Sequence, residues 1–182
     1  MGLLLRASRG IDSVTVWIGR AVSWLILLSI LVSAGNAVSR KAFSLSSNAW
    51  LELQWYLFSA AFLLAAAYTF QRNEHIRIDI ISNLLPKAAR NWIDLFGHFV
   101  MLLPLTFLIM REAIPWFARS FSIGETSNNF GGLIQWPAKF LIIAGFFLLA
   151  AQALSEIIKR VAVMRDLIPD PYDTVDPTAP IE

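Results

Sequence analysis

The side chains best suited to chemistry in this sequence are two histidines, and the chain has no cysteine. A membrane haem needs axial ligands on facing helices at matching depth. His98 lies inside an apolar run, whereas His75 follows another run, so the pair cannot supply bis-histidine ligation. No His, Asp and Glu cluster has metal-ligand spacing, and no phosphate loop or nucleophile–base arrangement is present. The sequence predicts a protein that is not an enzyme, with no catalytic, cofactor or metal site. A membrane redox enzyme stays as an alternative that an absorption spectrum would test.

Glu52 is the carboxylate with the most informative position, because it begins an apolar run between Trp50 and Trp55. A carboxylate at a helix N-terminus is stabilised by the helix dipole, and it could also pair with Arg40 across a short loop. The functional alternative is a proton or cation site, because ionisable groups inside membranes are often functional. The interfacial depth of Glu52 favours the structural role.

The other charged residues of the apolar runs lie mostly near their ends. Arg111–Glu112 and the pair Arg119 and Glu125 suggest local ion pairing or contact with a partner protein. Lys139 can extend to the membrane interface while its aliphatic stem stays in lipid. Glu156, Lys159 and Arg160 close the last run, and Gln152 can hydrogen-bond to a neighbouring helix.

Four apolar runs must position these side chains: residues 14–38, 51–70, 92–117 and 136–158. Each is long enough to cross about 30 Å of hydrocarbon at about 1.5 Å per residue. The hydrophobic fraction of 57% and the charged fraction of 15% also differ from those of soluble domains. The sequence predicts an all-α integral membrane protein with four transmembrane helices in one domain, residues 1–165. The midplane positions of the first, second and fourth runs are expected to be apolar.

The segments between the runs are short. Residues 71–91 mix charge with large aliphatic side chains, and isoleucines alternate at 76, 78 and 80. An isolated strand at a membrane has no hydrogen-bonding partner, so we predict a short interfacial helix there instead. Pro104 and Pro115 predict a bend in the third helix. Residues 166–182 are rich in proline and aspartate, which predicts a cytoplasmic tail without a core.

The basic residues predict the orientation of the four spans. Nine lie on the side of both termini and three on the other side, if those within helices are left out. The positive-inside rule therefore predicts that both termini are cytoplasmic. Tryptophans near the span ends form the expected aromatic belts. The net charge of +2 and the absence of a basic run with interleaved aromatics give no indication of nucleic acid as a partner.

Four segments together resemble the small membrane subunit, of the DctQ type, of tripartite ATP-independent periplasmic (TRAP) transporters. These segments are residues 48–58 (NAWLELQWYLF), residues 75–79 (HIRID), residues 125–128 (ETSN) and residues 136–139 (WPAK). They occur in the family's order and spacing across nearly the whole chain. One departure is the start of the second run, where this chain has Glu52, Leu53 and Trp55 and many relatives carry paired acids and a basic residue.

The resemblance implies a non-catalytic component of a secondary transporter in the bacterial inner membrane that takes up organic acids by symport. A soluble periplasmic protein would capture the substrate, and a large membrane subunit would carry the transport path and the sodium sites. This chain would act as a scaffold beside the large subunit and help to dock the binding protein. The residues expected at the structural or docking surface are Arg40, Glu52, Arg119, Glu125, Asn128 and Lys139. Those expected at a cytoplasmic interface are His75, Arg77 and Asp79.

The alternative within transport is a self-sufficient four-helix exporter that works as a dimer. Such a protein would need a membrane-embedded carboxylate that is essential for turnover, and transport by this chain alone would support it. The sequence does not identify the substrate or the helix faces that meet a partner.

Overall fold

A computed structural model describes residues 2–44, 47–72 and 86–170, and this part of the chain forms four long helices. The elements are α1 (Gly2–Phe43), α2 (Asn48–Gln71), α4 (Lys87–Phe96), the π-helical segment η1 (Gly97–Leu102), α5 (Leu103–Ile123) and α6 (Trp136–Met164). Segments α4, η1 and α5 form one continuous run, so four helices are long and apolar enough to cross a membrane. The all-helical, four-span prediction is confirmed. The predicted interfacial helix, the three residues of the proposed cytoplasmic interface (His75, Arg77 and Asp79) and the tail beyond Asp170 lie outside the described residues.

Each helix extends beyond the apolar run that predicted it. The largest difference is at the N-terminus, where α1 begins at Gly2 and includes the residues expected to precede the first span. No proline interrupts residues 2–13, and a helix satisfies its own backbone hydrogen bonds wherever it continues. Hydropathy marks where a helix enters hydrocarbon, not where the helix ends.

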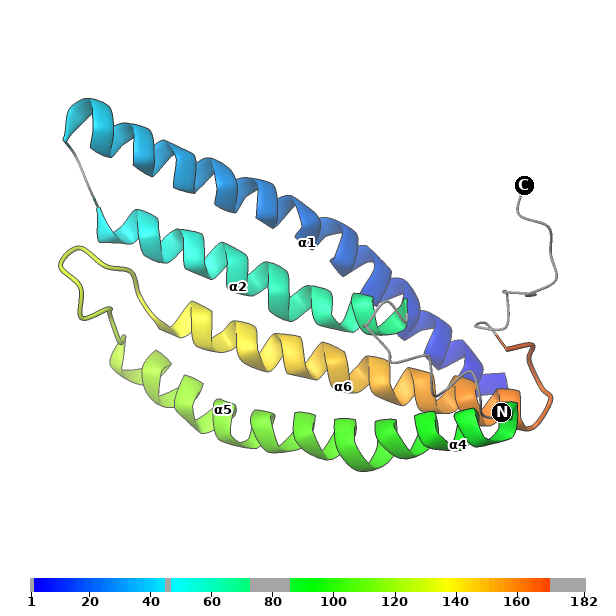
Figure 1. Ribbon diagram of the computed structural model, residues 1–182. Helices are drawn as coiled ribbons and strands as arrows, with labels where there is room; N and C mark the ends of the chain where they lie inside the picture. Colours follow the sequence, from blue (N-terminus) through cyan, green and yellow to red (C-terminus); the bar gives the residue numbers. More distant parts are fainter. Residues whose placement is uncertain (1, 45–46, 73–85, 171–182) are drawn as a thin grey trace, which may run out of the picture.

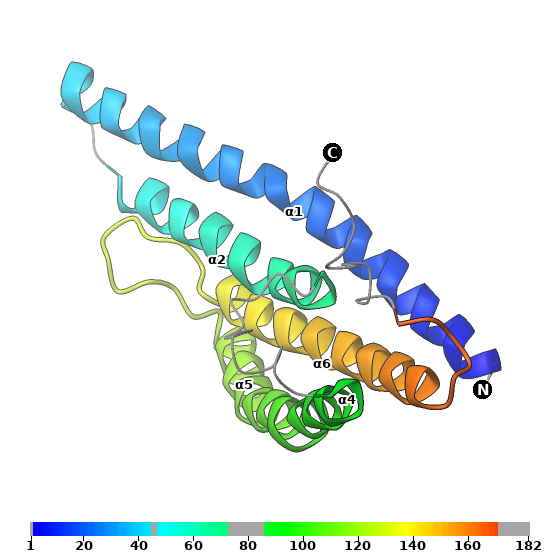
Figure 2. The same ribbon diagram turned by 45° about the vertical axis from the view of Figure 1, so that its right-hand side comes forward.

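The helices lie side by side in the order α1, α2, α6, α5 (Figure 1). Helix α6 contacts all three other long helices, and α5 packs mainly on α6. Figure 2 shows α4 and α5 on the side of α6 away from α1. The α4–η1–α5 run is bowed (Figure 1), and its π turn comes directly before Pro104. A π segment is a known source of helix distortion, as is proline.

The interior contains small and polar residues, and large apolar side chains lie on the exterior. The largest side chains that are fully buried belong to Gln152, Thr106, Ser8, Ser120 and Ser155. Large apolar side chains point outward, and Trp17, Phe62 and Phe107 are each about 70% exposed. Exposing so much apolar surface to water would be unfavourable, whereas contact with hydrocarbon or with another membrane protein would not. The arrangement is that of a helix layer held together by small and polar contacts in lipid.

Two glycines allow neighbouring helices to approach closely. A Cβ at Gly145 of α6 would lie 2.8 Å from the Cβ of Leu63 and 2.9 Å from its carbonyl oxygen. A Cβ at Gly19 of α1 would meet Tyr68 of α2 at 2.7 Å from its Cβ. Ser29 also donates a hydrogen bond of 3.2 Å to the carbonyl of Gln54. Close backbone approach through small residues is the usual basis of helix association in membranes.

The first predicted span contains one charged side chain, that of Arg20, and it is exposed. The hydrogen bond of 2.8 Å between Thr15 and Gln152 sets the antiparallel register of α1 and α6. Five residues further along α1, Arg20 is level with about residue 147 of α6. That level is the centre of the uncharged stretch of α6, residues 140–155.

Candidate functional site

The loop between α5 and α6, residues 124–135, folds back as a short hairpin. Gly124 ends α5 with a φ of 60°, and Gly131 has a φ of 69°, values that favour glycine. The backbone N–H of Ser127 donates to the carbonyl of Leu133 (2.9 Å), and that of Gln135 donates to Glu125 (2.9 Å). The glycines and these cross-loop bonds give the loop a defined shape.

Glu52, in the first turns of α2, is the anchor of this loop. Its side chain is only 5% exposed. Asn129 Nδ2 donates to Glu52 Oε1 at 2.9 Å, and the Leu133 N–H donates to Glu52 Oε2 at 2.6 Å. Ser127 Oγ also donates to Oε1. One carboxylate thus accepts three hydrogen bonds from a loop about 80 residues away in the sequence, and charge-assisted bonds of this kind are the strong ones.

Further contacts hold the same loop against α2. Asn48 Nδ2 donates to the Phe130 carbonyl at 3.0 Å, and the Tyr56 hydroxyl donates to the Ile134 carbonyl at 3.1 Å. Gly132 is required at its position, because a Cβ there would lie 2.9 Å from Glu52 Oε1 and 2.5 Å from the Cβ of Ser127. We call Glu52, Ser127, Asn129 and Leu133, together with Glu125 and Lys139, the loop-end cluster.

Lys139 connects the loop to α5 and α6. Its ammonium forms an ion pair with Glu125 and lies 4.5 Å from the centre of the Trp116 ring, and the residue is 5% exposed. The hydrogen bond from Lys139 is the main interaction that holds the pKa of the Glu125 carboxyl below its ordinary value. The buried lysine therefore has both a carboxylate and an aromatic face as partners, which offsets its desolvation.

Acidification should weaken this loop contact. Because the pKa of Glu125 is lowered on folding, its stabilisation is complete above the ordinary pKa of 4.5 and is lost as pH falls through the folded value. The melting-temperature difference between the native chain and a Glu125→Gln variant should therefore shrink below that pH, when measured in nanodiscs from pH 7 to pH 3. A difference that stays constant over that range would contradict this role of Glu125.

A groove of about 570 Å³ lies beside the loop-end cluster, between α2, α5 and α6. Its polar lining includes Glu52 and Lys139, and its apolar lining includes Trp55, Phe62 and Trp116. Glu52 and Lys139 each bind residues of the 124–135 loop.

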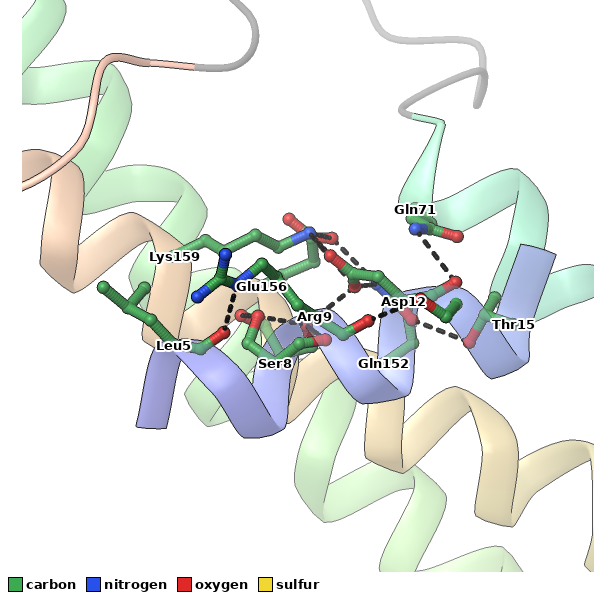
Figure 3. A network of polar contacts seen from close by, with 11 residues as sticks. Leu5, Ser8, Arg9, Asp12, Thr15, Gln71, Gln152, Glu156 and Lys159 are labelled. Atoms are coloured by element: carbon green, nitrogen blue, oxygen red, sulfur yellow. Dashed lines mark hydrogen bonds and ion pairs between the residues drawn. The ribbon is translucent and has the colours of Figure 1, made fainter. Parts of the chain in front are cut away.

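A second network, the terminal-end cluster, joins α1 to α6 at the other end of the layer. It consists of Ser8, Asp12, Thr15, Gln152, Ser155, Glu156 and Lys159 (Figure 3). Asp12 is central to it, since it accepts hydrogen bonds from Gln152 and Ser155 (both 2.8 Å) and pairs with Lys159 at 3.1 Å. Lys159 also lies 2.5 Å from Glu156. A single lysine thus neutralises two carboxylates.

Arg160 makes the corresponding connection from α6 to α4. Its guanidinium lies 2.8 Å from Asp94 and donates to Asn91 at 2.9 Å. Asp170, which the sequence placed in the tail, lies 3.5 Å from the same side chain. The charges at the end of α6 therefore bind other helices and the chain beyond α6.

The structure brings together some of the predicted site residues and separates others. Glu52, Glu125 and Lys139 belong to the loop-end cluster. The pair that Glu52 could have formed with Arg40 is not seen among the described residues, where both Glu52 oxygens bind the loop and Arg40 is exposed. Arg119 and Asn128 are exposed near the cluster. Sequence reasoning identified Gln152 as a helix-to-helix donor but missed Asp12.

Comparison with known families adds an independent observation. A family model described as the DctQ component of tripartite ATP-independent periplasmic transporters matches residues 14–163. The match extends from α1 to the last turn of α6 and includes both polar clusters except Ser8 and Asp12. The chain belongs to this family. No curated protein and no solved structure gave a match.

Membership of the DctQ family indicates the kind of assembly to which these polar clusters belong. The chain is a small component of a TRAP transporter, and its two polar clusters fix the relative positions of the helices at both ends of the layer. Among the described residues, no group of three His, Asp or Glu side chains is arranged to hold a metal ion. The polar chemistry that this DctQ component displays is the chemistry of holding helices and a loop together.

Proposed function

We propose that this chain is the non-catalytic small permease subunit of a TRAP-type secondary transporter for organic acids. In this proposal it lies in the bacterial inner membrane with both termini in the cytoplasm. It acts as a scaffold for the large subunit and presents a docking surface to the periplasmic binding protein. Transport, sodium coupling and substrate choice belong to the other two components, and the small subunit needs no cofactor.

The observation that supports this proposal most is that the buried polar groups bind other parts of the same chain. The buried charged side chains Glu52, Lys139, Glu156 and Arg160 lie near the two ends of the layer and are held in hydrogen bonds or ion pairs. Secondary transporters place substrate and ion sites near the midplane, on interrupted helices. A chain whose polar groups connect its own elements at both ends is suited to support a neighbouring transport path.

The loop-end cluster supports the docking part of the proposal. It holds the 124–135 loop in one shape and leaves Asn128 and Phe130 outward, Phe130 being 96% exposed. The positive-inside rule predicts that this loop lies in the periplasm. A preformed loop costs little further ordering when a partner binds.

Affinity purification from native membranes tests the proposal. Tagged chain extracted in mild detergent should carry a permease of about ten or more spans with it, and the binding protein should be retained after substrate is added. A Phe130→Ser variant should still carry the permease but retain less binding protein. Purification of the native chain without any such permease would contradict the proposal.

A further inference from the structure

Helix α5 carries an acid and a base side by side on its outer surface. Arg111 and Glu112 lie 3.9 Å apart, and their side chains are 70% and 74% exposed. They differ in this from the charges of the two polar clusters, which are buried between helices. Their surroundings on α5 are exposed apolar side chains, including Leu108 and Ile114.

The packing of α5 against α6 gives the depth of this pair. Phe117 lies 5.6 Å from Phe140 between ring centres, and Asp94 lies 2.8 Å from Arg160. The two helices are antiparallel with a nearly constant register, so Arg111 is level with about residue 144 of α6. The uncharged stretch of α6, residues 140–155, has its centre only about 5 Å further along the axis. Arg111 and Glu112 are therefore at hydrocarbon depth.

The pair also points away from the rest of the described chain. The residues of α5 that are buried are Thr106, Ala113 and Ser120, which share one face of the helix at intervals of seven. Arg111 follows Thr106 by five residues, which places it on the opposite side. Within the described residues α6 is the long helix against which α5 packs, and its outer side has no comparable neighbour.

Proline adds a backbone acceptor to this outer side. Pro115 has no N–H to give the carbonyl of Arg111, its i−4 partner in an α-helix. Freed carbonyls in membrane helices are commonly satisfied by neighbouring helices, side chains or water. The charged pair and this carbonyl therefore lie close together, and all of them need polar partners.

We propose that this face of α5, formed by Leu108, Arg111, Glu112 and Pro115, is the contact surface for a transmembrane helix of the large subunit. That helix presents an acid or acceptor to Arg111 and a base or donor to Glu112 at the same depth. Charged groups within membranes almost always face protein or a water-filled cavity, and pair with one another there. This inference rests on the proposed function, since the partner it names is the large subunit.

Arg20 on α1 gives the strongest competing surface, because it is exposed at a similar depth. It lies at the opposite edge of the layer and is a single charge, whereas α5 displays a complementary pair. Trp24 of α1, 67% exposed, is level with about residue 143 of α6 by the register of Thr15 and Gln152. It therefore provides a control position at the depth of Glu112.

Photocrosslinking in the intact complex compares the two edges. A benzophenone amino acid at Leu108, which is 54% exposed, should crosslink to the large subunit at least several-fold more than one at Trp24. Crosslinking from Leu108 to a second copy of this chain, to lipid alone, or less efficiently than from Trp24 would overturn the proposal. If no permease accompanies even the native chain, the proposed function fails; if it does but Leu108 is silent, only this inference fails.

A charge-swapped chain tests whether the large subunit recognises the polarity of the Arg111–Glu112 pair or only its zero net charge. The double variant Arg111→Glu with Glu112→Arg keeps the net charge and the internal pair but reverses the polarity toward a partner. It should recover at least fivefold less large subunit than the native chain in co-purification. The variant Arg111→Leu with Glu112→Leu should insert at normal levels yet lose the partner similarly. Equal recovery of the large subunit by all three chains would overturn the inference, and a normal elution profile of each purified chain shows that it is folded.

Discussion

Replacing Glu52 by glutamine is expected to release the 124–135 loop from α2. The substitution keeps the shape of the side chain but replaces one carboxylate oxygen by an NH₂ group. If it replaces Oε1, the NH₂ group faces the donors Ser127 and Asn129. If it replaces Oε2, the NH₂ group faces the Leu133 N–H. A donor then faces a donor, and at least one buried group is left unsatisfied. Amide hydrogen exchange of residues 127–135 in nanodiscs should accelerate on the order of tenfold or more.

The matched control for this experiment is Asn128→Ala. Asn128 lies in the same loop but is exposed, so its removal should leave exchange nearly unchanged. Under the proposed function, the Glu52→Gln variant should also bind the periplasmic protein less well, because the loop that we propose as the docking surface is no longer held in one shape. Unchanged loop exchange in the glutamine variant would mean that the cross-loop bonds and glycines suffice without Glu52.

Replacing Lys159 by methionine is expected to destabilise the other end of the layer. Lys159 is the cation between Asp12 and Glu156, and its side chain is 16% exposed. Without it two carboxylates share a largely buried site, and losing one partner of such a pair leaves an uncompensated charge. We expect a loss of about 2–3 kcal/mol in the free energy of unfolding, measured by tryptophan fluorescence during denaturation in mixed micelles.

Two further variants identify the cause of that loss. Arg165→Met removes an exposed cation from the same end of α6 and should change stability little. Adding Asp12→Asn to Lys159→Met removes one of the two unpaired carboxylates, so part of the lost stability should return. Equal losses in the single and double variants would show that Asp12 and Lys159 do not act as a pair.

The four helices could be predicted from the sequence because burial in hydrocarbon leaves a simple signal, a run of about 20 apolar residues. Their ends could not, because helix hydrogen bonding continues into polar residues. Asp12 was missed for this reason. It lies before the first apolar run, and only the extension of α1 to Gly2 brings it beside α6.

The partners of Glu52 were unpredictable for a different reason. The sequence indicated that a carboxylate at the start of α2 needs a partner, and Arg40 is a cation on the other arm of that hairpin. The actual partners come from a loop whose shape depends on Gly124, Gly131 and Gly132. Long-range contacts through an irregular loop have no periodicity to reveal them. The motif at residues 125–128 marked the right segment without showing what it binds.

The most direct test of the central claim is uptake by proteoliposomes. Vesicles with this chain alone should accumulate no organic acid above empty vesicles, with or without a sodium gradient. Vesicles with the large subunit, this chain and the binding protein should accumulate it when a sodium gradient is applied, and omitting this chain should abolish most uptake. Transport of any substrate by this chain alone would contradict the claim that it supports a transport path formed by another subunit.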